Sequence, residues 1–457
     1  MAKTRTQYSC TACGAISPQW AGRCPDCGAW NTMQECRPVA ASPRSRETRA
    51  HYAGDSGVTA LSDVGLSAET RRGTGIRELD RVLGGGLVEG GVVLLGGDPG
   101  IGKSTLLLQT TASLARDAEV LYVTGEESLR QVAIRAARLG LAADGLQVLA
   151  ETSVEAILEA RAARSPRVMV IDSIQTVFTE QLQSAPGSVA QVRESAALLV
   201  RHAKRSGTAL FLVGHVTKDG QLAGPRVLEH MVDTVLYFES DGGSRFRLLR
   251  AVKNRFGAAN ELGVFAMDDS GLKEVRNPSA IFLSRHEEDV SGSVVMVTRE
   301  GSRPMLVELQ SLLAESTLGN PRRVAVGMDQ NRLSMLLAVL HRHGGVMTAD
   351  QDVFINVVGG VRISETASDL PALLAALSSL RDRPVPGDTV VFGEVGLAGE
   401  IRPVPNGEER LREAAKHGFR RALVPVKNAP RGRNAIQGME VVPLRRMADA
   451  LEAAFDI

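Results

Sequence analysis

The sequence predicts a multidomain α/β protein whose largest part is a P-loop core built on a mostly parallel sheet. Three observations support this fold class. Short apolar segments that suit buried strands alternate with helical segments through the first half of the chain. The first strand, Val92–Leu95, leads directly into a glycine-rich loop and then a helical segment. At 457 residues, the chain is too long for one ordinary domain and suggests roughly three.

The elements of the core follow in order along the chain. Residues 74–87 predict a short helix and a glycine turn that leads into the first strand. The parallel strands that follow it are expected at Val120–Thr124, Leu146–Leu149, Val168–Ser173 and Ala209–His215. Val235–Phe238 and Arg245–Lys253 predict an antiparallel pair that closes the sheet.

Composition excludes several classes of protein. The hydrophobic content of 44% is ordinary for a globular protein, and no apolar run approaches the roughly 18 residues of a membrane span. The first residues are polar and lack an apolar signal core, so a cytoplasmic protein without membrane contact is expected. A net charge of +1 means that any nucleic-acid surface must be local.

A phosphate-binding loop follows the first strand. The stretch fits G-x-x-x-x-G-K-[ST], the Walker A pattern, in the strand–loop–helix context that this motif needs. Backbone N–H groups would surround the phosphates of ATP at the positive end of the helix dipole. Lys103 is expected to reach the β/γ oxygens and Ser104 to bind Mg²⁺. The predicted ATP-binding residues are Gly97, Asp98, Pro99, Gly100, Ile101, Gly102, Lys103, Ser104 and Thr105.

Polar residues at three strand ends are candidates for the remaining chemistry. Asp172 ends an apolar strand and is predicted to hold Mg²⁺ beside Ser104. Glu126 is the candidate that orients the attacking water, with Glu127 as the alternate; a pair that caps the next helix is the competing interpretation. His215 ends the strand neighbouring that of Asp172 and is a candidate γ-phosphate sensor, a structural histidine being the alternative.

Four of the five cysteines lie near the N-terminus in two Cys-x-x-Cys pairs, each followed by glycine. This spacing predicts a closed tetrahedral site for structural Zn²⁺ with the ligands Cys10, Cys13, Cys24 and Cys27. Cys36 is left as a thiol without a metal role. Trp20 and Trp30 are expected to pack over the two turns, aromatic contact with DNA being the alternative.

The chain is expected to divide into four parts. The second globular unit predicts an α+β fold, with strands at Gly292–Arg299 and Met305–Leu313 and helices at Asn331–His343 and Leu370–Leu380. The predicted boundaries are 1–36 for the zinc knuckle, 37–57 for a linker, 58–278 for the ATPase core and 279–457 for the second unit.

Three sequence strings resemble one known family. They are the Walker A loop with the preceding Gly84–Gly86, the string Ser184–Glu194, and Lys253-Asn254-Arg255-Phe256-Gly257. On these strings the chain resembles the bacterial RadA (Sms) family, relatives of the RecA recombinase, over essentially its whole length. The resemblance implies a RecA-type core, a homohexameric ring, and action on recombination intermediates in DNA repair. It also implies that Lys253, with Arg255, reaches the ATP of a neighbouring subunit.

Two loops of the core are implied to contact DNA. Residues 177–192 contain Pro186-Gly187, and residues 216–228 contain Lys218 and Arg226. In RecA-like rings the corresponding loops line the channel for single-stranded DNA. Glycine-containing loops with cations suit phosphate contact without base readout; surface loops without a ligand are the alternative.

Residues 350–457 resemble the proteolytic domain of Lon, which uses a serine nucleophile and a lysine base. The matching strings are Phe392–Val404 and Arg410–His417. Ala367 falls at the serine position and Glu408 at the lysine position, so no dyad remains for acyl transfer. The domain is therefore expected to act as a ring scaffold and, through a run of basic residues from Arg402 to Arg433, as a candidate DNA surface.

The leading hypothesis is a DNA-dependent ATPase that binds single-stranded and branched DNA and drives branch migration as a ring-shaped motor. Its cofactors would be Zn²⁺ and Mg²⁺, with ATP as the substrate and RecA as a partner. Three alternatives stay open: an ATP-dependent Lon-like protease, a RecA-type strand-exchange recombinase, and a zinc-anchored DNA-binding scaffold whose ATP site is a switch.

Overall fold

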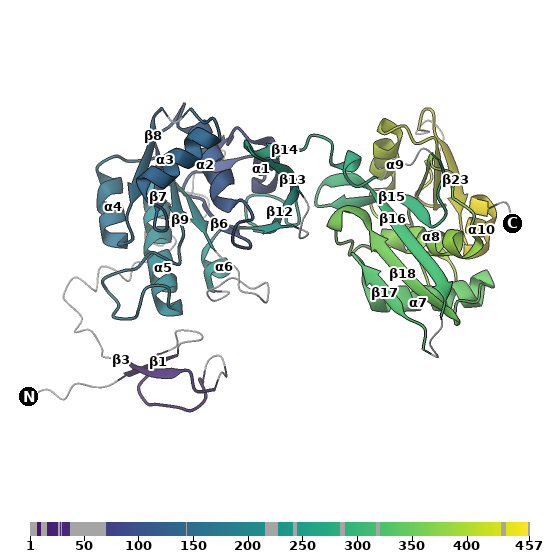
Figure 1. Cartoon of the computed structure of the whole chain (residues 1–457), viewed down its shortest axis with the longest axis horizontal. Helices are drawn as coiled ribbons and strands as arrows, with labels where there is room; N and C mark the ends of the chain where they lie inside the picture. The colour runs from purple at the N-terminus through teal and green to yellow at the C-terminus, as the bar shows by residue number, and fades with distance from the viewer. Residues whose placement is uncertain are drawn as a thin grey trace, which may run out of the picture. The chain divides into compact units, whose positions relative to one another are not determined.

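The computed structural model divides into two compact units, Met1–Val275 and Arg276–Ile457 (Figure 1). It describes residues 7–10, 16–25, 28, 30–36, 70–142, 144–214, 227–240, 245–283, 288–316, 320–430 and 436–455. Cys13, Cys27, His215 and nearly all of the predicted loop 216–228 lie outside the described residues. Among the helices that the structure describes, none is long and apolar enough to cross a membrane.

The N-terminal segment forms a small antiparallel sheet of order β2-β1-β3. Its strands are β1 (Gln7–Cys10), β2 (Ile16–Ser17) and β3 (Met33–Cys36). Cys10, Cys24 and Met33 are buried together, with Tyr8 packed against them. So small a sheet buries little apolar surface, which is the situation in which small domains use a metal for stability.

The core is a nine-stranded sheet of order β14-β13-β12-β11-β6-β10-β9-β7-β8. Six neighbouring strands from β8 to β11 are parallel, and β12, β13 and β14 continue antiparallel, as predicted for the closing pair. The strands are β6 (Val92–Gly96), β7 (Val120–Thr124), β8 (Leu146–Ala150), β9 (Val168–Asp172), β10 (Ala209–Val213), β11 (Thr234–Glu239), β12 (Phe246–Asn254), β13 (Leu262–Asp268) and β14 (Gly271–Glu274).

Helices cover both faces of this sheet because its central strands are apolar on both sides. In β6, Val93 and Leu95 pack with the cluster that contains α1, α2 and α3, whereas Val92 and Leu94 pack with α4, α5 and α6. The helices are α1 (Arg77–Leu83), α2 (Lys103–Leu114), α3 (Leu129–Arg138), α4 (Val154–Ala162), α5 (Val189–Ser206) and α6 (Val227–Met231). The predicted parallel α/β core is therefore confirmed.

Two local predictions need correction. The segment 177–192 is not a loop throughout, because α5 begins at Val189 with Ser188 as its N-cap, and its side chain accepts a hydrogen bond from Gln191 N. The loop therefore spans residues 173–188. The glycine turn at Gly84–Gly86 does not lead directly into β6; a short strand, β5 (Leu87–Val88), pairs with β4 (Arg71–Arg72) first.

The second unit is a mixed seven-stranded sheet of order β17-β18-β16-β15-β19-β22-β23, with a separate β20-β21 pair. This confirms the predicted α+β class. The strands are β15 (Ser293–Glu300), β16 (Arg303–Glu315), β17 (Arg323–Val326), β18 (Gln351–Val357), β19 (Thr389–Val391), β20 (Glu394–Val395), β21 (Ile401–Arg402), β22 (Arg421–Pro425) and β23 (Glu440–Leu444). The longer helices are α7 (Gln330–Gly344), α8 (Asp369–Arg381), α9 (Gly407–Lys416) and α10 (Met447–Phe455).

The core of this second unit lies between the sheet and helices α7, α8 and α10. Helix α8 is buried without interruption from Asp369 to Ser378, and its leucines pack against Leu336, Leu423 and Leu451. A helix that is apolar nearly all round belongs in the centre of a domain. Helix α8 is the segment whose N-terminus the Lon resemblance aligns with a nucleophile.

Candidate nucleotide-binding site and its surroundings

The predicted phosphate-binding loop connects β6 to α2 at the carboxyl edge of the parallel strands. Gly97, Gly100 and Gly102 have φ angles of 147°, 77° and 118°. At Gly97 a Cβ would lie 2.9 Å from Phe238 Cβ, and at both Gly97 and Gly102 the positive φ strains any residue with a side chain. Gly102 caps α2 without a side-chain hydrogen bond, which leaves the first N–H groups of the helix available to an anion.

Lys103 is folded into the loop that it is predicted to serve. It is 4% exposed, and its ammonium donates hydrogen bonds to Gly97 O at 2.7 Å and Asp98 O at 2.9 Å. Burial lowers the pKa of Lys103, and the carboxylates of Asp172 and Glu126 oppose that shift. The lysine therefore lies within the electrostatic reach of both predicted catalytic carboxylates, and the charge on a phosphate would favour its protonated form.

Asp172 ends β9 at the same edge, as predicted. It pairs in register with Thr124 of the neighbouring β7, and it is 8% exposed. The Tyr122 hydroxyl donates a hydrogen bond to Asp172 Oδ2. Burial, with Asp172 beside it, raises the pKa of Tyr122 well above its usual value, so this hydroxyl remains a donor. One carboxylate oxygen is thereby oriented by the protein, and carboxylate oxygen beside the Ser104 hydroxyl is a donor set that Mg²⁺ prefers.

The two adjacent glutamates after β7 have different partners. The Ser173 hydroxyl donates to Glu126 Oε1 at 2.5 Å, and Ser173 directly follows Asp172. Glu127 forms an ion pair with Arg135 of α3, and its N–H donates to Thr124 Oγ1 at 3.0 Å. Glu127 is thus occupied in anchoring the start of α3, whereas Glu126 lies next to the magnesium-ligand candidate. The geometry favours Glu126 over Glu127.

Lys253 and Arg255 lie at the opposite edge of the sheet from the phosphate-binding loop of their own chain. Val235 pairs with Lys253 and with Leu94, the middle residue of β6, whereas Gly96 at the end of β6 is in register with Tyr237. Arg255 N donates to Asp233 O, and Asp233 N donates to Val92 O at the start of β6. The Lys253 ammonium donates to Glu229 O in α6 at 2.6 Å and to Val232 O directly after α6 at 2.8 Å. A contact with ATP would therefore have to involve another subunit.

Arg255 has more freedom than Lys253. Its guanidinium lies 3.5 Å from Asp233 Oδ1, and its side chain is 60% exposed. Asp233 itself is buried; it also pairs with Lys204 and accepts a hydrogen bond from Val92 N at 3.0 Å. Of the two predicted cations, Arg255 is the better placed in this structure to reach a second molecule.

The loop 173–188 after Asp172 is held in part by the buried side chain of Gln191, and Glu155 also accepts hydrogen bonds from Thr179 Oγ1 at 2.5 Å and Glu180 N at 3.4 Å. Gln191, 1% exposed on the first turn of α5, accepts from Thr179 N at 2.9 Å. Its amide group donates to Thr179 O at 3.1 Å, Leu182 O at 3.1 Å and Ser184 O at 3.0 Å. The tip at residues 185–187 remains exposed. The loop contains no lysine or arginine, and the nearest cation in the sequence is the exposed Arg193.

Two functional contacts were not found from the sequence. Tyr122 carries a hydroxyl in the middle of a strand whose other residues, apart from Thr124 at its end, are aliphatic, and that pattern was the available signal. Arg247, at the start of β12, donates from Nε to Ile101 O in the phosphate-binding loop at 3.3 Å, and nothing local in the sequence indicates this contact.

The predicted zinc site is described in part. Cys10 and Cys24 are buried in one cluster, and Gly28 N donates to Cys24 O at 2.9 Å. Two buried cysteines brought together from separate segments of the chain fit a zinc site. The two tryptophans are not buried on this sheet, because Trp20 is 59% and Trp30 70% exposed.

The positions aligned with the Lon dyad hold no catalytic pair. Ala367 is buried before α8, and Glu408 on α9 forms an exposed ion pair with Arg412. Arg410, 1% exposed, donates to both oxygens of Glu365, at 2.9 and 2.5 Å, and to Val297 O at 2.6 Å. Arg410 therefore belongs to the interior and not to the expected basic surface.

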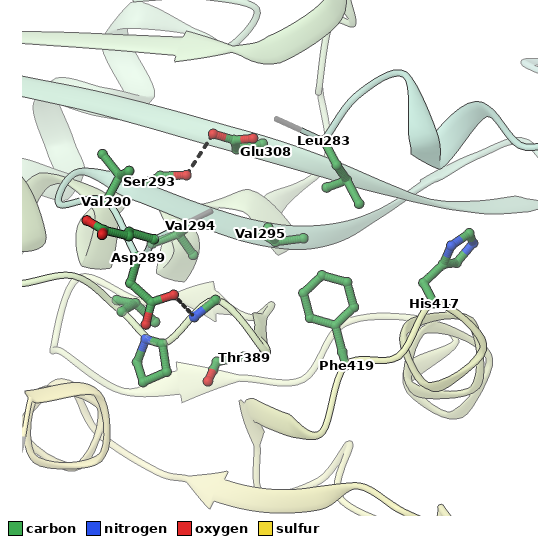
Figure 2. Close-up of a pocket in the computed structure, with 14 residues that line it drawn as sticks. Leu283, Asp289, Val290, Ser293, Val294, Val295, Glu308, Thr389, His417 and Phe419 are labelled. Carbon is green, nitrogen blue, oxygen red and sulfur yellow. Dashed lines mark hydrogen bonds between the residues drawn. The ribbon is translucent and has the colours of Figure 1, made fainter. Parts of the chain in front are cut away.

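A cavity of about 500 Å³ lies in the second unit beside β15 and β19 (Figure 2). Glu308 accepts hydrogen bonds from Ser293 Oγ at 2.7 Å and Gln310 Nε2 at 2.8 Å, and Asp289 Oδ1 accepts from Gly387 N at 2.9 Å. Figure 2 shows Phe419 and His417 on the side opposite these carboxylates. Because none of the described lining residues is a lysine or arginine, the cavity is a poor site for phosphate.

Comparison with known proteins agrees with this arrangement. Family models match residues 8–35 (rubredoxin metal binding domain), 59–221 (AAA domain) and 321–428 (subunit ChlI of Mg-chelatase). The chain is 65% identical to the DNA repair protein RadA of Pseudomonas aeruginosa, with full coverage of both chains. The chain belongs to the RadA family.

Other RadA proteins match over nearly their whole length. Those of Escherichia coli K12 and Bacillus subtilis are 59% and 48% identical, with 100% and 99% of both chains covered. A solved KaiC-like protein from Pyrococcus horikoshii aligns at 22% identity and a TM-score of 0.39, covering 45% of this chain and 99% of that one. The RadA matches include both the cysteine pairs and the second unit, so the organisation of the whole chain is shared with this family.

Proposed function

We propose that the chain is an ATPase of DNA repair that hydrolyses ATP in response to single-stranded DNA and drives branch migration of recombination intermediates. The observation that carries the proposal is the meeting of Lys103, Asp172 and Glu126 at one sheet edge, directly beside the start of the loop 173–188. Full-length similarity to proteins named DNA repair protein RadA supports DNA as the target.

ATP hydrolysis follows from the roles of these residues. Glycine N–H groups and the start of α2 would bind the phosphates, and Lys103 would exchange its bonds to Gly97 O and Asp98 O for phosphate oxygens. Ser104 and the Tyr122-oriented Asp172 would hold Mg²⁺, which neutralises charge on the phosphates. Glu126 would orient the attacking water and accept its proton.

The loop 173–188, which directly follows Asp172, would couple the ATP site to DNA. Asp172 and Ser173 are consecutive, Ser173 contacts Glu126, and the loop that starts there ends in the turn held by Gln191. A change at Glu126 on hydrolysis would therefore act on a loop whose tip is exposed. We propose that this tip, together with Arg193 on α5, contacts single-stranded DNA, and that residues 216–228 supply a second contact.

A ring explains the placement of the remaining cations. Lys253 and Arg255 lie at the edge away from their own phosphate-binding loop, so they would complete the site of an adjacent subunit. We propose a homohexamer in which ATP occupies the subunit interfaces. The loss of a serine and a lysine at positions 367 and 408, with the buried Arg410–Glu365 pair beside them, argues against the protease alternative.

The test is branch migration on deproteinised joint molecules, with ATP and no added recombinase. Wild type should convert them to fully exchanged products, whereas Glu126→Gln should bind ATP and lose turnover by about 10²-fold or more. Glu127→Gln is the matched control, because its ion pair with Arg135 lies outside the chemistry.

Three results would contradict the proposal. If the wild-type protein with ATP does not move the branch points of the joint molecules, branch migration is not its activity. ATP-dependent degradation of casein would favour the protease alternative. Joint molecules formed from separate strands by this protein alone would indicate a recombinase. Loss of turnover in Glu127→Gln but not in Glu126→Gln would reassign the water-orienting group.

A further inference from the structure

Both tryptophans of the chain are exposed on the N-terminal sheet. The sequence contains two, and they are 59% and 70% exposed at positions 20 and 30. Tryptophan is highly buried on average, and an exposed indole is typical of a surface that binds something. Placing both on a segment with so little apolar core indicates that stability of the sheet is not their purpose.

Both indole rings border the same residue, Gly22, which has no side chain. A Cβ at Gly22 would lie 3.8 Å from Trp20 Cη2 and 4.0 Å from Trp30 Cζ3, so the benzo ends of both rings border the same glycine. The Trp20 indole N–H donates to Met33 O at 3.2 Å, which fixes that ring by its edge and leaves its polar group satisfied. What remains open to solvent is aromatic surface in a defined orientation.

The cation Arg23 lies beside Trp30, one of the two exposed tryptophans. The Arg23 guanidinium lies 5.9 Å from the centre of the Trp30 ring, and Arg23 Nε donates to Gly28 O at 3.0 Å. Arg23 and Trp30 also pair as a backbone bridge, so the cation is held beside the ring by main chain and side chain together. Aromatic faces with an adjacent arginine suit a ligand that combines flat rings with negative charge.

The surroundings favour a nucleic-acid base over an apolar protein surface. Among the described residues of this sheet, Trp20 and Trp30 are the large apolar side chains that are exposed, and their neighbours Gln19, Asn31 and Thr32 are polar. The centre of a protein–protein contact is usually more apolar than this. Every unpaired base offers a flat face, whereas the bases of a duplex are already stacked.

We propose that Trp20, Arg23 and Trp30 form a stacking site for unpaired bases of single-stranded DNA, in addition to the loops of the ATPase core. The inference rests on the proposed function, because it takes DNA as the polymer that the chain handles. Stacking does not depend on base identity, so this site would hold single strands without sequence preference.

Tryptophan fluorescence provides a direct test, because these two residues are the chain's complete set of tryptophans. The full zinc-loaded chain is titrated with oligothymidylate while intrinsic fluorescence and the anisotropy of end-labelled DNA are recorded together. The expected result is quenching that saturates with the anisotropy signal, while a duplex of equal length causes none. DNA binding without quenching overturns this inference and leaves the proposed function intact; no binding by anisotropy contradicts both.

Substitutions of Trp30 test whether this residue itself contributes to DNA affinity. Trp30→Ala should weaken oligothymidylate binding about 5-fold or more, and Trp30→Tyr should recover most of the loss because it keeps an aromatic face. Zinc content measured on each variant confirms that the sheet is intact. Equal affinities for Trp30→Ala and wild type overturn the proposal. So does protection of the DNA-free wild type from acrylamide quenching, because the rings would then already be covered by protein.

Discussion

Replacing Gln191 by alanine should release the loop 173–188 without altering the phosphate-binding loop. The buried amide accepts from Thr179 N and donates to three carbonyls between Thr179 and Ser184. Its two N–H groups and one oxygen amount to about three net hydrogen bonds, each contributing about 1 kcal/mol. The loop should therefore open more easily by about 3 kcal/mol, which corresponds to about a 10²-fold loss of hydrogen-exchange protection.

Hydrogen exchange read by mass spectrometry on peptides that span the loop measures this directly. Gln191→Ala should lose protection at the Thr179 amide. Gln191→Glu can still accept from Thr179 N but cannot donate to the three carbonyls, so it should loosen the stretch from Leu182 to Ser184 while keeping part of the protection at Thr179. Gln183→Ala is the control, since Gln183 lies in the same loop with an exposed side chain. Affinity for single-stranded DNA should fall in the two Gln191 variants while ATP affinity is kept. Wild-type protection in Gln191→Ala would refute the account of this loop.

Three further predictions concern the other sites. Lys253→Ala should keep ATP affinity and lose DNA-stimulated turnover by about 10³-fold or more, and steady-state ATPase at the wild-type rate would remove its role in the neighbouring site. Arg410→Ala leaves the Glu365 carboxylate without its arginine partner and should destabilise the second unit by about 3–5 kcal/mol in denaturant unfolding. Arg412→Ala removes an exposed ion pair and should lower the free energy of unfolding by only about 0.5 kcal/mol. Equal losses in the two variants would contradict the role of the buried pair. One zinc ion per chain is expected by elemental analysis; Cys27→Ser should lose it and Cys36→Ser should keep it, and loss in Cys36→Ser would change the ligand set.

The parts of the site that could be predicted are those fixed by local sequence. The glycine spacing from Gly97 to Gly102 determines the loop, because the backbone at both ends adopts a positive φ that strains a residue with a side chain. Asp172 and Glu126 could be placed because the carboxyl ends of neighbouring parallel strands meet at one edge. The structure brings both within the electrostatic environment of Lys103.

The rest depends on partners that are distant in sequence. Arg410 looked like one of a run of surface cations, yet Glu365, 45 residues earlier, draws it into the interior. Arg247 reaches the phosphate-binding loop from a strand 146 residues later. The exposure of Trp20 and Trp30 was not evident from the sequence for another reason: hydrophobicity favours burial, but a sheet with strands of two to four residues has too little surface to cover two indoles.

ATP turnover with and without single-stranded DNA, on wild type and Lys103→Ala, tests the central claim most directly. Wild type should hydrolyse ATP slowly alone and faster with oligothymidylate. Lys103→Ala should lose turnover in both conditions while keeping its fold, because the ammonium that would bind the phosphates is gone. Wild-type turnover that DNA leaves unchanged, or Lys103→Ala that still hydrolyses ATP at the stimulated rate, would contradict a DNA-dependent ATPase built on this loop.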